Sequence, residues 1–207
     1  MIVEFFGQAG SGKTTVARLL AEQNNWPLVK VKSKARLAGW NLLFLFSHPV
    51  KFFGRLGYVF GNSLSLKMFY FKFMNLFLNV NAKHQKALLQ TGTAIIDQGY
   101  LHSVMSVFEN KVSLPVMARY LKFIMYPDKL VFFETTPEVL AQRIKARGYF
   151  AREWLNPAQL LAWQEVINHN NLVFKELVNQ LPGPILKVDA NHNPQAIADQ
   201  IKTFIQS

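Results

Sequence analysis

The stretch that decides the fold is Gly7-Gln8-Ala9-Gly10-Ser11-Gly12-Lys13-Thr14, close to the start of a chain of 207 residues. It fits the pattern G-x-x-x-x-G-K-[S/T], whose glycine-rich loop turns backbone N–H groups toward phosphate oxygens. The apolar residues 2–6 predict a short strand before the loop, and residues 13–23 predict a helix after it. Glu4 lies inside that strand, either at an edge, paired or facing the site. The spacing therefore predicts a strand, a phosphate-binding loop and a helix.

The side chains of this loop predict how a nucleoside triphosphate and its metal ion are held. Lys13 is expected to reach the β- and γ-phosphates, and the Thr14 hydroxyl is expected to take one place on Mg²⁺. The helix N-terminus adds the positive end of its dipole. The expected nucleotide-binding residues of the loop and the helix start are Gly7, Gly10, Ser11, Gly12, Lys13, Thr14 and Thr15.

The rest of the chain alternates between strand and helix signals. Further strands are predicted at 28–32, 93–96, 129–133 and 185–188, and helices at 101–108, 136–147, 156–181 and 194–205. Residues 33–90 predict several helices, with breaks near His48-Pro49 and at Gly54, Gly57 and Gly61. Five short apolar strands separated by helices predict an α/β fold with three layers, in which helices cover both faces of a five-stranded parallel sheet. No linker divides the chain, so residues 1–207 are expected to form one domain.

Asp97 stands directly after the expected strand 93–96, at the end of a parallel sheet that faces the phosphate loop. There a carboxylate can hold the water shell of a metal ion or accept the proton of an attacking hydroxyl. Asp97 is therefore the candidate metal ligand, together with Thr14, or the candidate catalytic base. Capping the helix that starts near Gly99 is a compatible alternative role.

Arginines gather at the end of the expected helix 136–147. Arg143 and Arg147 lie four residues apart on one face, and Arg152 follows Gly148. On a loop that closes over a phosphoryl donor, such arginines would neutralise charge in the transition state. Arg143 and Arg147 are therefore catalytic candidates, with a plain solvated arginine as the alternative for either one.

The positive charge of the chain is confined to one segment. Net charge is +11, from 23 basic and 12 acidic side chains, yet no Asp or Glu occurs between positions 23 and 96. That stretch also holds 13 of the 28 aromatic residues. The whole chain has no cysteine, which excludes disulfides and thiolate zinc sites. The N-terminus lacks the basic start of a signal peptide, so a cytoplasmic protein is expected. The basic side chains of the segment are Lys30, Lys32, Lys34, Arg36, Lys51, Arg55, Lys67, Lys72, Lys83 and Lys86.

Several of these features together resemble thymidylate kinase and the related deoxynucleoside and nucleoside monophosphate kinases. The resemblance covers about residues 1–30 and 93–205, and it implies an adenylate-kinase-like core with strand order 2-3-1-4-5. It also implies ATP as donor, a lid at about 143–156, and Asp189 and Ala190 beside the adenine. The stretches that carry it are the loop 7–14, Asp97-Gln98-Gly99-Tyr100, 132–138, 142–148 and Lys187-Val188-Asp189-Ala190.

The acceptor region departs from that family. Gln98 stands where relatives carry an arginine, and a neutral amide cannot replace a charged bidentate group. The helical, aromatic-rich insertion 33–92 is expected to bind the acceptor or to dock a partner, and the acceptor-binding candidates are Lys32, Lys34, Arg36 and Gln98. Three alternative functions stay open. In the first, the chain transfers phosphate from ATP to a small, anionic or nucleotide-like acceptor. In the second, it is a polynucleotide 5′-kinase or a nucleic-acid-dependent ATPase. In the third, it is a nucleotide switch that docks a membrane or a partner through residues 33–92. The sequence also allows a homodimer.

Overall fold

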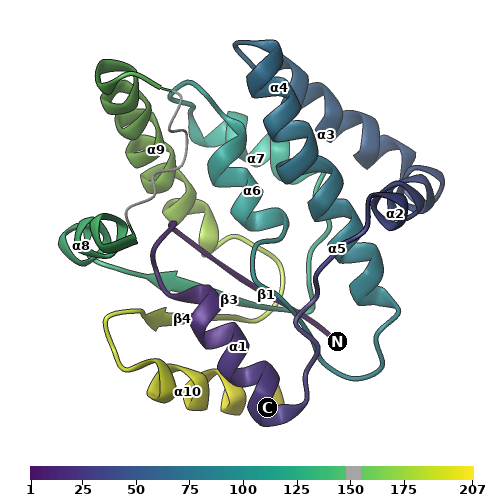
Figure 1. The fold of residues 1–207 in the computed structure, drawn as a ribbon, viewed down its shortest axis with the longest axis vertical. Coiled ribbons are helices and arrows are strands. Elements are labelled where there is room, and N and C mark those ends of the chain that lie inside the picture. Colours follow the sequence, from purple (N-terminus) through teal and green to yellow (C-terminus); the bar gives the residue numbers. More distant parts are fainter. Residues whose placement is uncertain (148–154) are drawn as a thin grey trace.

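A computed structural model describes residues 1–147 and 155–207 of the chain (Figure 1). The first strand, the loop and the first helix form as expected, and the helices between 33 and 92 follow them. The elements in chain order are β1 (Ile2–Gly7), α1 (Lys13–Asn24), α2 (Lys34–Ser47), α3 (Pro49–Gly61), α4 (Leu66–Lys72), the π-helix η1 (Phe73–Leu78), α5 (Asn79–Leu88), β2 (Ala94–Ile96), α6 (Tyr100–Val107), α7 (Leu114–Leu121), β3 (Lys129–Glu134), α8 (Pro137–Arg147), α9 (Pro157–Val178), β4 (Ile185–Asp189) and α10 (Pro194–Gln206).

The sheet is parallel throughout, and its order is β2-β1-β3-β4. The four strands keep the relative order that the sequence predicts, but the prediction of five strands is wrong. Residues 28–32 contribute a single bridge, between Leu28 and Ile95, beside the edge strand β2. Because β2 itself is only three residues long, it offers this segment few backbone partners, and the chain leaves the edge toward α2.

Helices cover both faces of the sheet, as predicted (Figure 1). On one face Val3 and Phe5 of β1 pack with α1 and α10. On the other face Phe6 packs with α6 and α9, in a larger core that continues into α3 and η1. Since successive side chains of a strand point to opposite faces, Glu4 shares the α6 face with Phe6.

The segment 33–92 is helical, and its aromatic residues divide between core and surface. Phe44 and Phe77 are fully buried in the larger core, whereas Phe46 and Phe53 are 81% and 61% exposed. The predicted helix break at His48-Pro49 is confirmed, because α2 ends at Ser47 and α3 begins at Pro49. The predicted breaks at Gly54 and Gly57 are wrong, since α3 continues through both. At Gly54 the ring of Phe123 fills the space that a Cβ would occupy, which gives this helical glycine a packing role.

A buried polar cluster ties this segment together. The Arg55 guanidinium is fully buried, donates to the Asn81 side chain and to the Leu76 carbonyl at 2.7 Å, and lies 4.4 Å from the Tyr100 ring centre. Asn81 in turn donates to Asn41 at 3.1 Å. A second buried cation, Lys72, is paired with Glu109, two residues after the end of α6. Hydrogen bonds and ion pairs therefore fix α2–α5 to one another and to the core.

No helix in the described part of the chain is both long and apolar enough to cross a membrane.

Candidate functional site

The phosphate loop closes on itself around the Lys13 ammonium. Gly12 has a left-handed φ of 88° and directly precedes α1. Lys13 Nζ donates to the carbonyl of Gly7 at 2.9 Å, to the carbonyl of Gln8 at 2.6 Å and to Ser11 Oγ at 3.1 Å. The ammonium thus lies over the loop, at the carboxyl edge of the sheet and the start of a helix, where phosphate oxygens bind best.

Thr14 and Asp97 meet beside this loop. Thr14 Oγ1 donates to Asp97 Oδ2 over 3.2 Å. The contact follows from topology: β1 and β2 are neighbours, Asp97 directly follows β2, and Thr14 lies in the first turn of α1, which the phosphate loop connects to the carboxyl end of β1. A hydroxyl and a carboxylate are ligands that Mg²⁺ accepts, usually with several waters kept. The described residues hold no cluster of three or more His, Asp or Glu that would bind a metal by themselves. These two side chains therefore fit a metal ion that is held partly by phosphates.

Arg143 reaches from α8 to the phosphate loop and to the loop after β4. Its Nη2 donates to the Ala190 carbonyl at 2.9 Å, and its Nη1 lies 3.8 Å from the place that a Cβ on Gly12 would take. Asp189 turns the chain here by accepting from the Asn191 backbone at 2.9 Å. One arginine therefore connects the phosphate loop with the loop after β4. Arg147 ends α8, but its side chain lies outside the described part, as do residues 148–154, which include Arg152 and much of the expected lid 143–156.

The expected acceptor-binding residues are spread over the surface. Lys32, Lys34, Arg36 and Gln98 are all exposed. In the described part of the chain, no hydrogen bond or ion pair joins the first three to the phosphate loop. Gln98 directly follows Asp97, but its contact with α5 is made by its backbone carbonyl, which accepts a hydrogen bond from Lys83.

Lys83, on α5, is the side chain at this site that sequence reasoning did not select. Its Nζ lies 3.6 Å from Asp97 Oδ1 and donates to the Gln98 carbonyl at 3.3 Å. Burial lowers the pKa of Lys83, while the neighbouring Asp97 carboxylate acts in the opposite direction. The two oxygens of Asp97 thus face different partners, Thr14 on one side and Lys83 on the other. No local pattern marks Lys83, because it is one of ten basic residues in a segment without acids.

Glu4 is buried and caps α6. Its carboxylate accepts the backbone N–H groups of Leu101 at 2.7 Å, Tyr100 at 3.1 Å and His102 at 3.3 Å. Gly99 permits this approach, since a Cβ there would lie 2.5 Å from the carboxyl group. Burial raises the pKa of Glu4 to about 7, and the three backbone hydrogen bonds partly oppose that shift. Of the three alternatives left by the sequence, Glu4 is therefore the paired one.

His102 places a neutral imidazole beside the phosphate loop. Burial, and then the Lys13 ammonium, lower the pKa of His102 to about 3. It therefore adds no positive charge near Lys13 at neutral pH.

The side chain of Asn171 lines a small cavity of about 20 Å³ next to the phosphate loop, together with Gln8, Thr135 and other residues. Asn171 is buried, and neither atom of its amide has a hydrogen-bond partner among the described residues. The cavity has room for about one water molecule, which would satisfy this amide.

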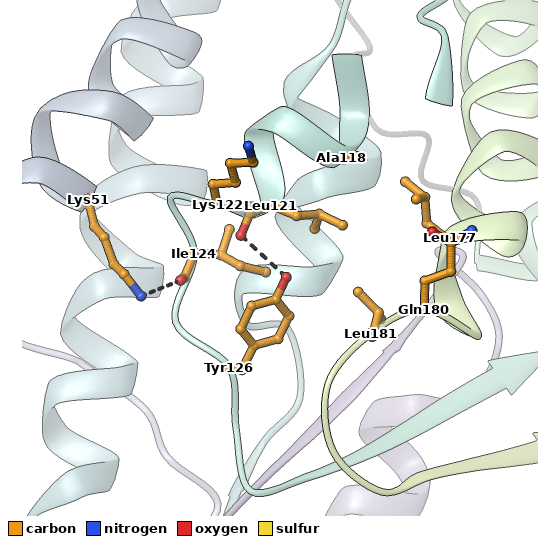
Figure 2. Close-up of a pocket in the computed structure, with 9 residues that line it drawn as sticks. All are labelled: Lys51, Ala118, Leu121, Lys122, Ile124, Tyr126, Leu177, Gln180 and Leu181. Atoms are coloured by element: carbon orange, nitrogen blue, oxygen red, sulfur yellow. Dashed lines mark hydrogen bonds between the residues drawn. The ribbon is translucent and has the colours of Figure 1, made fainter. Parts of the chain in front are cut away.

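A larger cavity, of about 320 Å³, lies away from this site (Figure 2). Figure 2 shows Lys51 of α3 donating to the Ile124 carbonyl and Tyr126 donating to the Leu121 carbonyl, at 2.9 and 3.3 Å. The loop that carries Ile124 and Tyr126 leads into the amino end of β3, whereas the phosphate loop lies at the carboxyl edge of the sheet. The cavity is therefore separate from the cluster around Lys13 and Asp97.

The sheet, the phosphate loop and the helices on both faces together define a P-loop kinase-like fold, and the fold expected from the sequence resemblance is confirmed at this level. A solved structure of deoxyadenosine kinase from M. mycoides with bound dATP is similar to this chain over 100% of both chains, with 17% identity and a TM-score of 0.60. The same enzyme with bound dCTP matches over 100% of this chain and 99% of its own, at 15% identity and a TM-score of 0.58. No protein-family model matches the sequence, and no curated protein does.

Proposed function

We propose that this protein is an ATP-dependent phosphotransferase that moves the γ-phosphoryl group of ATP to a small, anionic or nucleotide-like acceptor. The observation that carries the proposal is the contact of Thr14 with Asp97 beside the Lys13 ammonium. A phosphate-binding cation, a hydroxyl and a carboxylate at one edge of a parallel sheet are the parts that phosphoryl transfer requires.

Each part has a defined task in this proposal. The loop amides and Lys13 bind the β- and γ-phosphates, and Thr14 and Asp97 hold Mg²⁺, which neutralises phosphate charge when it is bound. Arg143 lies where it can contact the nucleotide between Gly12 and Ala190. Asp97 also fits the role of base for the acceptor hydroxyl, because one of its oxygens points toward Thr14 and the other toward the acceptor segment.

In this proposal the acceptor binds next to the segment 33–92. The fold is shared with a deoxyadenosine kinase, which supports a nucleoside or nucleotide as acceptor. The exposed Lys32, Lys34 and Arg36 would then act in recruiting an anionic substrate, since exposed charges steer ligands over several ångströms and bind them weakly. The uncharged Gln98 disfavours thymidylate as the acceptor, because relatives that bind it carry an arginine at this position.

Lys13→Ala is the direct test. Loss of the ammonium removes charge stabilisation of the transition state, so ATP turnover should fall by at least about a hundredfold. Arg18→Ala, an exposed residue of the same helix, is the matched control and should retain turnover. The assay follows ATP consumption across nucleosides, nucleotides, sugars and 5′-hydroxyl oligonucleotides, with unfolding monitored by circular dichroism. Unchanged turnover in the folded Lys13→Ala protein would refute the mechanism.

The exposed apolar side chains of α2–α4 favour a second role for this segment. Phe46, Phe53, Phe60 and Leu66 are between 61% and 87% exposed, and no acidic residue lies near them in sequence. We propose that these exposed side chains also dock an anionic membrane or a protein partner, including a second copy of the chain. We also propose that the protein works in the cytoplasm. Flotation with vesicles of neutral and of anionic lipid, and light scattering for the oligomeric state, test this role. Salt-sensitive binding of single-stranded nucleic acid would favour a polynucleotide substrate instead.

A further inference from the structure

Lys83 is held differently from the other buried lysine of the segment. Lys72 Nζ makes three short contacts, to Glu109 at 2.5 Å, to the Asn62 carbonyl at 2.6 Å and to the Val107 carbonyl at 2.7 Å. Among the described residues, Lys83 Nζ has one hydrogen bond of 3.3 Å and one ion pair of 3.6 Å. Charge-assisted hydrogen bonds of an ammonium are normally about 2.7–2.9 Å, so Lys72 is fully engaged and Lys83 is held loosely.

A loosely held buried ammonium has capacity for another partner. The group carries three N–H donors, and burying a charge is costly unless anionic or polar groups surround it. The side chain of Lys83 is only 10% exposed, and the segment 23–96 contains no carboxylate of its own. Among the described residues, Asp97 is the carboxylate that forms an ion pair with the Lys83 ammonium, and Glu4 adds a weaker attraction. A further anionic oxygen would complete the coordination of this ammonium.

The position of Lys83 specifies where that oxygen would come from. α5 carries the lysine from the acceptor segment to the same carboxylate that receives the Thr14 hydroxyl on its other oxygen. The helix is anchored on both sides: Asn81 binds Asn41 of α2, and Ala87 packs with Ala94 and Ile96 of β2. The ammonium is thus presented to the carboxyl edge of the sheet from the side opposite to Arg143 and the loop after β4.

We propose that Lys83 is a further catalytic residue of this site, whose ammonium donates to an anionic oxygen of the acceptor or of the phosphoryl group in transfer; this inference rests on the proposed function. The uncharged side chain of Gln98, at the same corner, cannot supply this charge, and the loosely bound lysine supplies it from another element. The chain would then meet the phosphoryl group with cations from three elements: Lys13 of α1, Arg143 of α8 and Lys83 of α5.

The test compares Lys83→Met, which keeps the length and removes the charge, with Lys83→Arg, which keeps the charge. Lys86→Met is the matched control on the same helix, because the Lys86 ammonium donates to the Lys30 carbonyl at 2.8 Å and has no ion pair with a described residue. Lys83→Met should lower kcat/KM about ten- to a hundredfold, as expected for loss of one hydrogen bond between charged groups. Lys83→Arg should retain most activity, and Lys86→Met should match the unsubstituted protein.

Binding of ADP and of the β,γ-imido analogue of ATP to the full chain, measured by calorimetry, identifies the source of the oxygen. If Lys83→Met weakens the analogue and spares ADP, the contact is to the phosphoryl group. If both bind normally and the KM for the acceptor rises, the contact is to the acceptor. A folded Lys83→Met protein with normal kinetics and normal binding would overturn the inference. If the unsubstituted protein transfers no phosphate, the proposed function fails. In that case, equal binding of the ATP analogue by the unsubstituted protein and by Lys83→Met overturns the role of Lys83 as well.

Discussion

The buried pair of Lys72 and Glu109 should dominate the stability of the join between α4 and α6. Both side chains are almost inaccessible, at 0% and 4% exposure, and their charged atoms lie 2.5 Å apart. Removing one partner of such a pair leaves a charge in a site without its counterion, which typically costs about 3–5 kcal/mol. Lys72→Met and Glu109→Met should therefore each lower the free energy of unfolding by about that amount.

The double variant gives the sharper result. With both charges removed, the remaining cost includes the two carbonyls, of Asn62 and Val107, that lose a strong donor, on the order of 1–3 kcal/mol. The effects of the two single substitutions should therefore fail to add by about 2 kcal/mol or more. The assay is urea unfolding of all four proteins at one pH and ionic strength.

An internal control is available in the exposed pair of Lys111 and Glu165. Its atoms lie 3.4 Å apart, but the two side chains are 54% and 73% exposed, so its coupling should stay below about 1 kcal/mol. Burial and not pairing would then explain the difference. Additive effects at Lys72 and Glu109, or costs as small as those of the exposed pair, would refute the reasoning.

Two further predictions concern Glu4 and Arg143. Because the pKa of Glu4 is raised to about 7 in the folded protein, the fold keeps a proton that the unfolded chain loses above its usual value of 4.5. This contribution is fully present below pH 4.5 and is lost as the pH rises through 7, by up to about 3 kcal/mol. Glu4→Gln should remove that slope, which urea unfolding at pH 5 and pH 8 measures as a difference from the unsubstituted protein; identical slopes would contradict it. Arg143→Ala should weaken ATP binding about tenfold in calorimetry, because it loses the bridge from Gly12 to Ala190, whereas the exposed Lys145→Ala on the same helix should not. Equal affinities of these two variants would exclude Arg143 from the nucleotide site.

Local features of this site could be predicted from the sequence, and features that depend on distant segments could not. The phosphate loop is contiguous, so its residues imply its geometry. The meeting of Thr14 with Asp97 also follows from sequence, because parallel neighbouring strands bring their carboxyl ends together. Lys83 is different: it approaches Asp97 from a helix whose placement depends on the packing of α2 and β2, and nothing in its neighbours along the chain marks it.

The edge of the sheet shows the same limit. Alternation at 28–32 predicts a strand, but what forms there is an isolated bridge between Leu28 and Ile95, with the Val29 N–H donating to the Ile95 carbonyl at 2.9 Å. A strand also needs a partner of matching length, however, and β2 provides only three residues. Strand propensity is therefore readable from one segment, while pairing is a property of two.

The buried lysines of the segment 33–92 make this segment depend on the core for its charge balance. Lys72 and Lys83 bury their charges within this segment, but the carboxylates that balance them, Glu109 and Asp97, belong to the core. Cut away from the core, the segment would keep two cations in its interior without either counterion. Conversely, helices without the two lysines, placed on this core, would take these two cationic partners away from the Glu109 and Asp97 carboxylates.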